Sequence, residues 1–140
     1  MTSKTENFRN HHTEVRALSA RIHHLLDADT VTTDPGPIAS VVRELFGKFG
    51  VHLAIEDSTL YPRMLAHDDP RLQQAAQRFQ REMGGLKTKF DAYRQRWPGS
   101  IAISRNPKAF IAETREILTA LDTRIAREDR ELYDLYDRAA

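Results

Sequence analysis

Four stretches of helical periodicity, separated by three proline-containing breaks, constrain the fold of this chain more than any other feature. Within each stretch, apolar residues recur at steps of three and four, which places them on one face of a helix. No stretch has the two-residue alternation that is typical of a strand. The breaks fall at residues 29–37, 67–70 and 98–107, and the stretches cover residues 8–26, 38–60, 72–97 and 110–135.

The dipeptides Asp69-Pro70 and Asn106-Pro107 indicate where two of these helices begin. In each, a side chain that can cap a helix precedes a proline that suits the first helical turn. Four long helices with short connections pack most simply as antiparallel neighbours. We therefore predict an all-α fold, an up-down-up-down antiparallel four-helix bundle, with residues 1–140 forming a single domain.

Composition excludes several classes of function. The 21 basic residues against 20 acidic ones give a net charge of +1, which is too small to attract nucleic acid electrostatically. The chain has no cysteine, so disulfides, thiolate ligands and cysteine nucleophiles are excluded. No apolar run approaches the roughly 20 residues of a membrane span, and the polar start of the chain shows no secretory signal. We therefore expect a cytoplasmic protein with neither nucleic acid nor a membrane as its partner.

A ten-residue pattern occurs twice, at residues 52–61 and 124–133, with the same Ala, Glu, Asp, Leu and Tyr in both copies. The first copy begins His52-x-x-x-Glu56, and residues four apart lie on one face of a helix. An imidazole and a carboxylate placed in this way can bind one metal ion. The second copy has Arg124 before Glu128, and a guanidinium cannot ligate a metal. The pair of repeats therefore indicates a two-metal site with part of its ligand set removed.

The same polar residues fall on the apolar faces of three helices. His12 lies about 15 residues before the first break and His52 about 15 residues after it, so the two should meet at one level. Counting residues from the second break places Phe79 and Met83 of the third helix at that level. Counting from the third break places Arg124 and Glu128 of the fourth helix there. We predict a buried layer built from His12, His52, Glu56, Arg124 and Glu128, to which the third helix adds no polar group. Each residue also has an ordinary structural explanation, as a hydrogen-bonded core histidine or as an ion pair within one helix.

The remaining histidines and two glycines carry less information. Helical phase favours an inward His12 over its neighbour His11, so His11, His23, His24 and His67 are interpreted as structural or solvated. Gly84-Gly85 should cost a helix roughly 2 kcal/mol relative to alanine. A kink or close helix packing would explain the pair. The alternative is that the missing side chains admit a small ligand to the polar layer.

These motifs resemble the hemerythrin-like, or His-His-Glu cation-binding, family over nearly the whole chain. The resemblance rests on residues 12–16, on His52 to Pro62 with its Glu-Asp and Leu-Tyr-Pro, and on residues 124–133. It implies two non-haem irons inside the bundle, bridged by carboxylates, and a protein that binds, senses or processes oxygen, nitric oxide or peroxide. Carried over residue by residue, His12, His52, Glu56 and Glu128 match the ligands of one iron, including both bridging carboxylates.

This chain departs from the family pattern at the other iron. Met83 stands where the resemblance implies a third-helix histidine, and Arg124 stands where it implies the fourth-helix histidine. The losses are therefore grouped at one metal position. We predict that Arg124 replaces the charge of the lost metal, because its guanidinium can donate to both Glu56 and Glu128 in a fork.

Two interpretations remain open. The first is a hemerythrin-like protein with one non-haem iron, or Mn or Zn, in a sensing or regulatory role toward oxygen, nitric oxide or redox state. Its partner would be a small diatomic ligand. The alternative is a metal-free interaction or regulatory module that binds a protein partner and keeps a buried Arg–carboxylate cluster. An oxidase or peroxidase ranks last, because two-electron oxygen chemistry is harder with a single iron, so the chain is expected to be a binding protein more than an enzyme.

Overall fold

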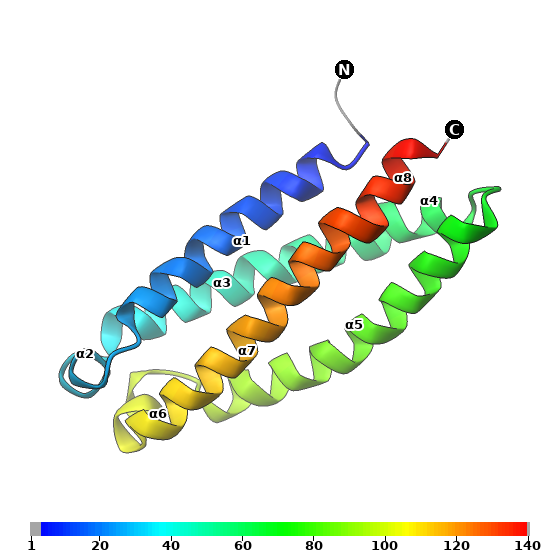
Figure 1. Cartoon of the computed structure of the whole chain (residues 1–140). Helices are drawn as coiled ribbons and strands as arrows, with labels where there is room; N and C mark the ends of the chain where they lie inside the picture. Colours follow the sequence, from blue (N-terminus) through cyan, green and yellow to red (C-terminus); the bar gives the residue numbers. More distant parts are fainter. Residues whose placement is uncertain (1–3, 140) are drawn as a thin grey trace.

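The computed structural model describes residues 4–139, which form helices joined by short turns. Four long helices make up the body of the molecule. Figure 1 shows that each runs opposite to the one before it, so that both ends of the described chain lie at the same end of the bundle. No strand occurs in residues 4–139. The predicted all-α antiparallel four-helix bundle is therefore confirmed. The long helices are α1 (Glu6–Leu25), α3 (Gly36–Ile55), α5 (Pro70–Arg96) and α7 (Pro107–Arg127).

The predicted helix starts are also confirmed. Asp69 caps α5 by accepting a hydrogen bond from the backbone N–H of Arg71. Asn106 caps α7 by accepting one from the backbone N–H of Ala109. In both cases the next residue is a proline that begins the helix. These side chains satisfy backbone donors that have no partner within the helix.

Two of the breaks hold short helices that the sequence analysis did not predict. They are α2 (Ala28–Thr33) in the first break and α6 (Ser100–Arg105) in the third. Each short helix buries one apolar side chain against the main core, Val31 in α2 and Ile103 in α6. Both lie at the end of the bundle opposite the chain ends (Figure 1) and close the core there. Burial of these side chains explains why the breaks are ordered.

Two of the long helices continue into π-helical turns. The end of α3 passes through η1 (Glu56–Leu60) into α4 (Tyr61–Leu65). The end of α7 passes through η2 (Glu128–Tyr133) into α8 (Asp134–Arg138). Each wide turn begins at the glutamate of a sequence repeat and brings the tyrosine five positions later onto the same face. The two repeats therefore share an unusual backbone as well as a sequence.

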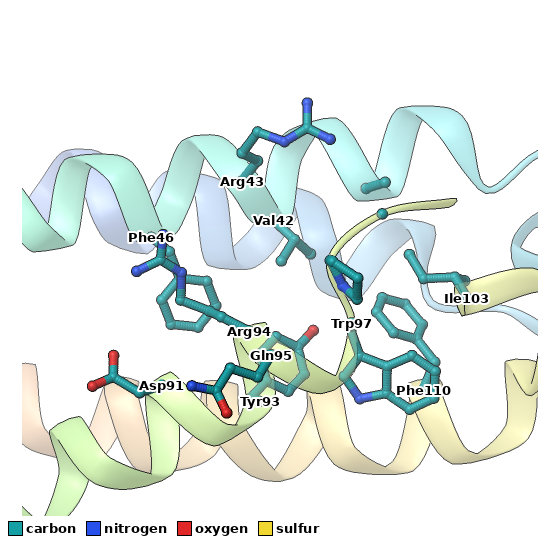
Figure 2. A pocket seen from close by; sticks show the side chains of 13 residues that line it. Val42, Arg43, Phe46, Asp91, Tyr93, Arg94, Gln95, Trp97, Ile103 and Phe110 are labelled. Atoms are coloured by element: carbon teal, nitrogen blue, oxygen red, sulfur yellow. The ribbon is translucent and has the colours of Figure 1, made fainter. Parts of the chain in front are cut away.

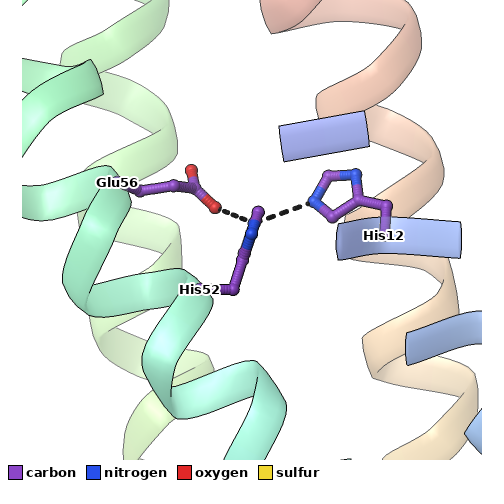
Figure 3. A group of neighbouring side chains, drawn as sticks. All are labelled: His12, His52 and Glu56. Carbon is purple, nitrogen blue, oxygen red and sulfur yellow. Dashed lines mark hydrogen bonds and ion pairs between the residues drawn. The ribbon is translucent and has the colours of Figure 1, made fainter. Parts of the chain in front are cut away.

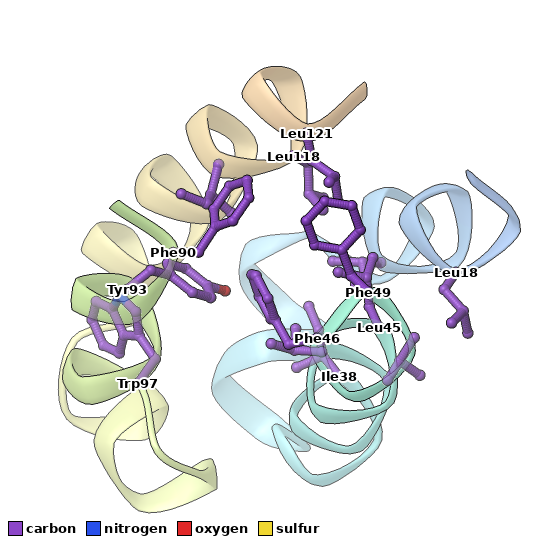
Figure 4. Close-up of a cluster of buried hydrophobic side chains, with 14 of the residues drawn as sticks. Leu18, Ile38, Leu45, Phe46, Phe49, Phe90, Tyr93, Trp97, Leu118 and Leu121 are labelled. Atoms are coloured by element: carbon purple, nitrogen blue, oxygen red, sulfur yellow. The ribbon is translucent and has the colours of Figure 1, made fainter. Parts of the chain in front are cut away.

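The apolar core is divided into two clusters. The larger one fills the half of the bundle nearer α2 and α6, and Figure 4 shows its aromatic and leucine side chains converging from the long helices. The smaller one lies toward the chain ends and includes Phe8, Leu60, Phe79 and Leu132. On α1 and α3 the inward polar residues lie between members of the two clusters. The bundle therefore has a polar layer between two apolar halves.

Gly84 and Gly85 do not bring two helices together. Helix α5 runs unbroken through both, and both are exposed. A Cβ added at either position would have no neighbour within 4 Å. The expectation of close helix packing at this pair is therefore wrong.

None of the helices described is long and apolar enough to span a membrane.

Candidate metal centre

The five predicted polar residues lie together in the layer between the two apolar clusters. His12, His52, Glu56, Arg124 and Glu128 are each at most 2% exposed. They come from α1, α3 with η1, and α7 with η2, as the counting of levels predicted. Burial of ionisable groups at this depth is costly unless they are paired or bound to a cation. Their convergence is confirmed, whereas their role as metal ligands stays a prediction.

The two histidines face each other across the bundle. His12 Nε2 lies 3.1 Å from His52 Nε2, and the ring centroids are 4.6 Å apart. Figure 3 shows the His52 ring between His12 on one side and Glu56 on the other. Glu56 is one turn further along the same helix, and its Oε1 contacts His52 Nε2. One donor atom from each of these three residues lies within 4.8 Å of the others, which is a grouping that can hold a metal ion.

Glu128 lies at the edge of this group. Its Oε1 is 3.9 Å from His12 Nε2 and 3.3 Å from Arg124 Nε. The second oxygen of Glu128 and that of Glu56, both Oε2 atoms, are buried and accept no hydrogen bond from the described residues. Buried carboxylate oxygens without donors are unfavourable in a metal-free protein and are suited to a cation.

Burial also governs the protonation of the two carboxyls. It raises the pKa of Glu56 to about 7. For Glu128, burial and then the nearby charge of Glu56 raise the pKa to about 8. Burial lowers the pKa of His52, which favours the neutral imidazole that a metal requires. Burial therefore favours the uncharged forms of these three groups. A bound cation would offset the cost of ionising the two carboxyls.

Arg124 takes a position different from the one predicted. Its guanidinium donates to Glu128 at 3.3 Å, to the Tyr61 hydroxyl at 3.1 Å and to the Phe79 carbonyl at 2.8 Å. No hydrogen bond joins it to Glu56 in the described part of the chain. The expected fork to both carboxylates is therefore wrong. The guanidinium instead uses the Phe79 carbonyl of α5 and the Tyr61 hydroxyl of α4.

The third long helix contributes more than the sequence suggested. The Phe79 ring lies under the Arg124 guanidinium at 4.6 Å, in addition to accepting through its carbonyl. Glu82 Oε2 lies 3.6 Å from Arg124 Nη1 and 2.8 Å from Arg127 Nη1. Among the residues described, no polar side chain of α5 is buried in this layer, as expected, but the Phe79 carbonyl and the half-exposed Glu82 contact Arg124 from this helix. Met83, the position of the lost ligand, belongs to the larger apolar cluster.

The buried histidines have outer partners that hold their rings. His12 Nδ1 donates to Asp129 at 2.8 Å, and Arg16 donates to the other oxygen of Asp129 at 2.7 Å. Burial opposes ionisation of Asp129, but these two contacts outweigh it and lower its pKa. A carboxylate bound to the far nitrogen of a histidine is a common outer partner at metal sites. Asp129 thus leaves His12 Nε2 free to bind an ion.

His11 was interpreted as structural or solvated, but the structure places it against the site. Its Nδ1 lies 3.3 Å from His52 Nδ1, on the side of the ring away from His12. Both histidines line a groove of about 240 Å³ between α1 and α3, with Val51 and Lys48 at its side. The groove therefore lies beside His11 and the buried side chain of His52.

Two tyrosines of the site were missed by the sequence analysis. Tyr61 closes the first repeat and contacts Arg124 of the second, whereas Tyr133 closes the second and lies 3.5 Å from His52 of the first. Their identity in the two repeats was a usable signal. The sequence alone did not indicate that these tyrosines face the site, because a side chain five residues after a glutamate lies on the same helix face as that glutamate only in a π-helical turn.

A separate hollow of about 490 Å³ lies in the other half of the bundle (Figure 2). Phe46, Tyr93, Trp97 and Phe110 line it, together with Arg43 and other residues, and no histidine does. It is not part of the polar layer.

Residues 3–136 match the Hemerythrin HHE cation binding domain. The chain belongs to the hemerythrin HHE cation-binding family. No curated protein and no solved structure matched it.

The residues of this HHE domain fit one cation but not a symmetric pair. On the side of α1 and α3, two imidazoles and a carboxylate converge, and a buried carboxylate oxygen has no donor among the residues described. On the side of α5 and α7, the Arg124 guanidinium is hydrogen-bonded in place and Met83 is packed among apolar side chains. A fixed cationic group disfavours a second metal ion nearby.

Proposed function

We propose that this HHE domain binds one non-haem metal ion through His12, His52, Glu56 and Glu128. The observation that carries the proposal is the buried group of His12, His52 and Glu56, in which Glu56 Oε2 has no hydrogen-bond donor within residues 4–139. Glu128 extends the group through its Oε2, which accepts from no donor in the described part of the chain. Iron suits two imidazoles with carboxylates, and Mn or Zn would accept the same donors.

We further propose a sensing or regulatory role toward oxygen, nitric oxide or redox state. The groove between α1 and α3 reaches His52, and its volume of about 240 Å³ would admit a diatomic molecule. Four protein donors leave room for such a ligand on an ion that takes five or six. The surrounding apolar clusters restrict water, which favours reversible binding of a small ligand.

The test is metal analysis of the full chain, purified without chelator and without a nickel column. The expected result is about one ion per chain in the parent and loss of that ion in His52→Ala. His67→Ala, a histidine change outside the site, is the matched control and should keep the ion. Equal metal content in the parent and in His52→Ala would show that the ion is held elsewhere.

The ion pair of Arg124 with Glu128 favours a second candidate, a metal-free module with a protein partner. In this alternative, the guanidinium supplies enough positive charge for the carboxylates and no ion is needed. A parent protein that remains metal-free after incubation with iron(II), iron(III), manganese(II) and zinc(II) would support this alternative and reject the metal site.

A further inference from the structure

The hydroxyl of Tyr133 lies against both buried histidines. Its oxygen is 3.4 Å from His12 Nε2 and 3.5 Å from His52 Nε2. Both distances are long for a hydrogen bond from a hydroxyl. The side chain is fully buried. The phenol oxygen therefore shares the space of the two ring nitrogens that face the centre of the layer.

The spacing of these three atoms matches the edges of a coordination shell. Two donors at 2.0–2.1 Å from a tetrahedral ion are separated by about 3.3 Å, and by about 2.9 Å if they are adjacent in an octahedron. The three observed separations are 3.1, 3.4 and 3.5 Å. Oxygen and nitrogen atoms at these distances can bind one ion with small side-chain movements.

The ring of Tyr133 is held in this position. It stacks on the His12 ring at 5.2 Å with an interplanar angle of 11°, and Phe8 packs beside it at 6.2 Å. The π-helical turn η2 is what turns this side chain inward on the face of Glu128. The matching Tyr61 is directed instead at Arg124, 3.1 Å away. The two repeats thus place one tyrosine at the histidines and the other at the arginine.

We propose that Tyr133 is a further metal ligand, which binds as a phenolate beside His12, His52 and Glu56 and directs the site toward iron(III). The assignment rests on the proposed function, because it requires that the site binds an ion. A phenolate is a hard anionic donor and suits a trivalent ion better than a divalent one. Its negative charge, added to that of Glu56, offsets the higher charge of the ion.

The binding step balances without any redox change. The O–H bond of Tyr133 breaks, its proton leaves to solvent, and an oxygen lone pair forms the bond to iron(III). Release of protons on metal binding is general for protein ligands.

The experiment uses the full chain loaded with iron(III) under aerobic conditions. The parent should show a visible tyrosinate-to-iron charge-transfer band and phenolate ring modes in the resonance Raman spectrum. Tyr133→Phe should lose both signals. Tyr93→Phe is the control, because Tyr93 is another buried tyrosine, hydrogen-bonded to Thr114 outside the polar layer, and it should keep both.

A second measurement compares the affinities for iron(III) and zinc(II). Tyr133→Phe should lower the affinity for iron(III) by at least about 10-fold, a loss seen even for outer partners of metal sites, and lower that for zinc(II) less. Tyr93→Phe should change the ratio of the two affinities little.

The outcomes separate this assignment from the metal site itself. If the parent binds iron(III) but shows no phenolate modes, the Tyr133 assignment is wrong and the metal site stands. If the parent binds no ion, both proposals fail. The spectrum of the parent decides the matter even if Tyr133→Phe does not fold.

Discussion

The guanidinium of Arg124 in the second repeat donates a hydrogen bond, 3.1 Å long, to the hydroxyl of Tyr61 in the first. The reciprocal pair is Tyr133 and His52, with the hydroxyl 3.5 Å from the imidazole Nε2. The last residue of each repeat therefore contacts the first residue of the other. In this crossed arrangement, the arginine at the first position of the second repeat uses a partner that the first repeat supplies.

Arg124→Ala should destabilise the metal-free protein by about 3–5 kcal/mol, because it leaves Glu128 buried without its ion-pair partner. The Phe79 carbonyl and the Tyr61 hydroxyl lose a donor in the same variant. The measurement is chemical denaturation in chelator at pH 8. Added divalent metal should restore part of the loss by binding linkage.

The matched control is Arg127→Ala on the same helix, where the side chain is 34% exposed. Its pairs with Glu82 and Glu131 are near the surface and should contribute about 1 kcal/mol or less. Equal stability of Arg124→Ala and the parent, with and without metal, would show that the guanidinium does not compensate the carboxylates.

Arg124→His should raise the metal stoichiometry or affinity above that of the parent. The change gives the second repeat the His-x-x-x-Glu spacing of the first and removes the cation that disfavours a second ion. Occupancy of a second site should stay incomplete because Met83 is a weak donor within the apolar cluster. Elemental analysis of iron per chain checks this. Two irons per chain in the parent, with oxo-bridged di-iron absorption, would contradict the single-ion site.

Asp129→Asn should lower metal affinity by about 10–100-fold, because the amide is a weaker acceptor and no longer orients the His12 ring. The matched control is Asp57→Asn, which changes the exposed counterpart in the first repeat. Calorimetric titration with zinc(II) gives both affinities. A similar loss in the two variants would mean that Asp129 acts only through net charge.

Glu56→Gln should stabilise the metal-free protein relative to the parent as pH rises from about 4.5 to 7. Burial raises the pKa of Glu56 from 4.5 to about 7, so in this range the unfolded chain ionises while the folded one holds its proton. The unfolded state then binds fewer protons, and the stability of the parent falls with rising pH through this group. Glutamine has no proton to lose.

The measurement for Glu56→Gln is the free energy of unfolding at pH 5 and pH 8 in chelator. The free energy of unfolding of the variant, relative to that of the parent, should be higher at pH 8 than at pH 5. His52 changes stability with pH in the opposite direction, but it is present in both proteins, so its contribution cancels in the difference. A constant difference at both pH values would show that the Glu56 carboxyl has an ordinary pKa in the folded protein.

The sequence by itself determined the helices and the level of the polar layer. Apolar residues at steps of three and four fix which face of each helix is buried, and the capping residues Asp69 and Asn106 fix where two helices begin. Equal distances from a break place His12 and His52 at one height, because antiparallel helices rise equally per residue. These are properties of local spacing, so they could be read without a structure.

Only the tertiary structure decided how the side chains in that layer are paired. Arginine has many rotamers, and the choice of Tyr61 and the Phe79 carbonyl over Glu56 depends on what neighbouring helices offer. The wide turns after Glu56 and Glu128 follow no hydrophobic period, yet they set where Tyr61 and Tyr133 point. An extra residue in a helical turn is stabilised by packing across the bundle, and that packing is a property of the whole fold.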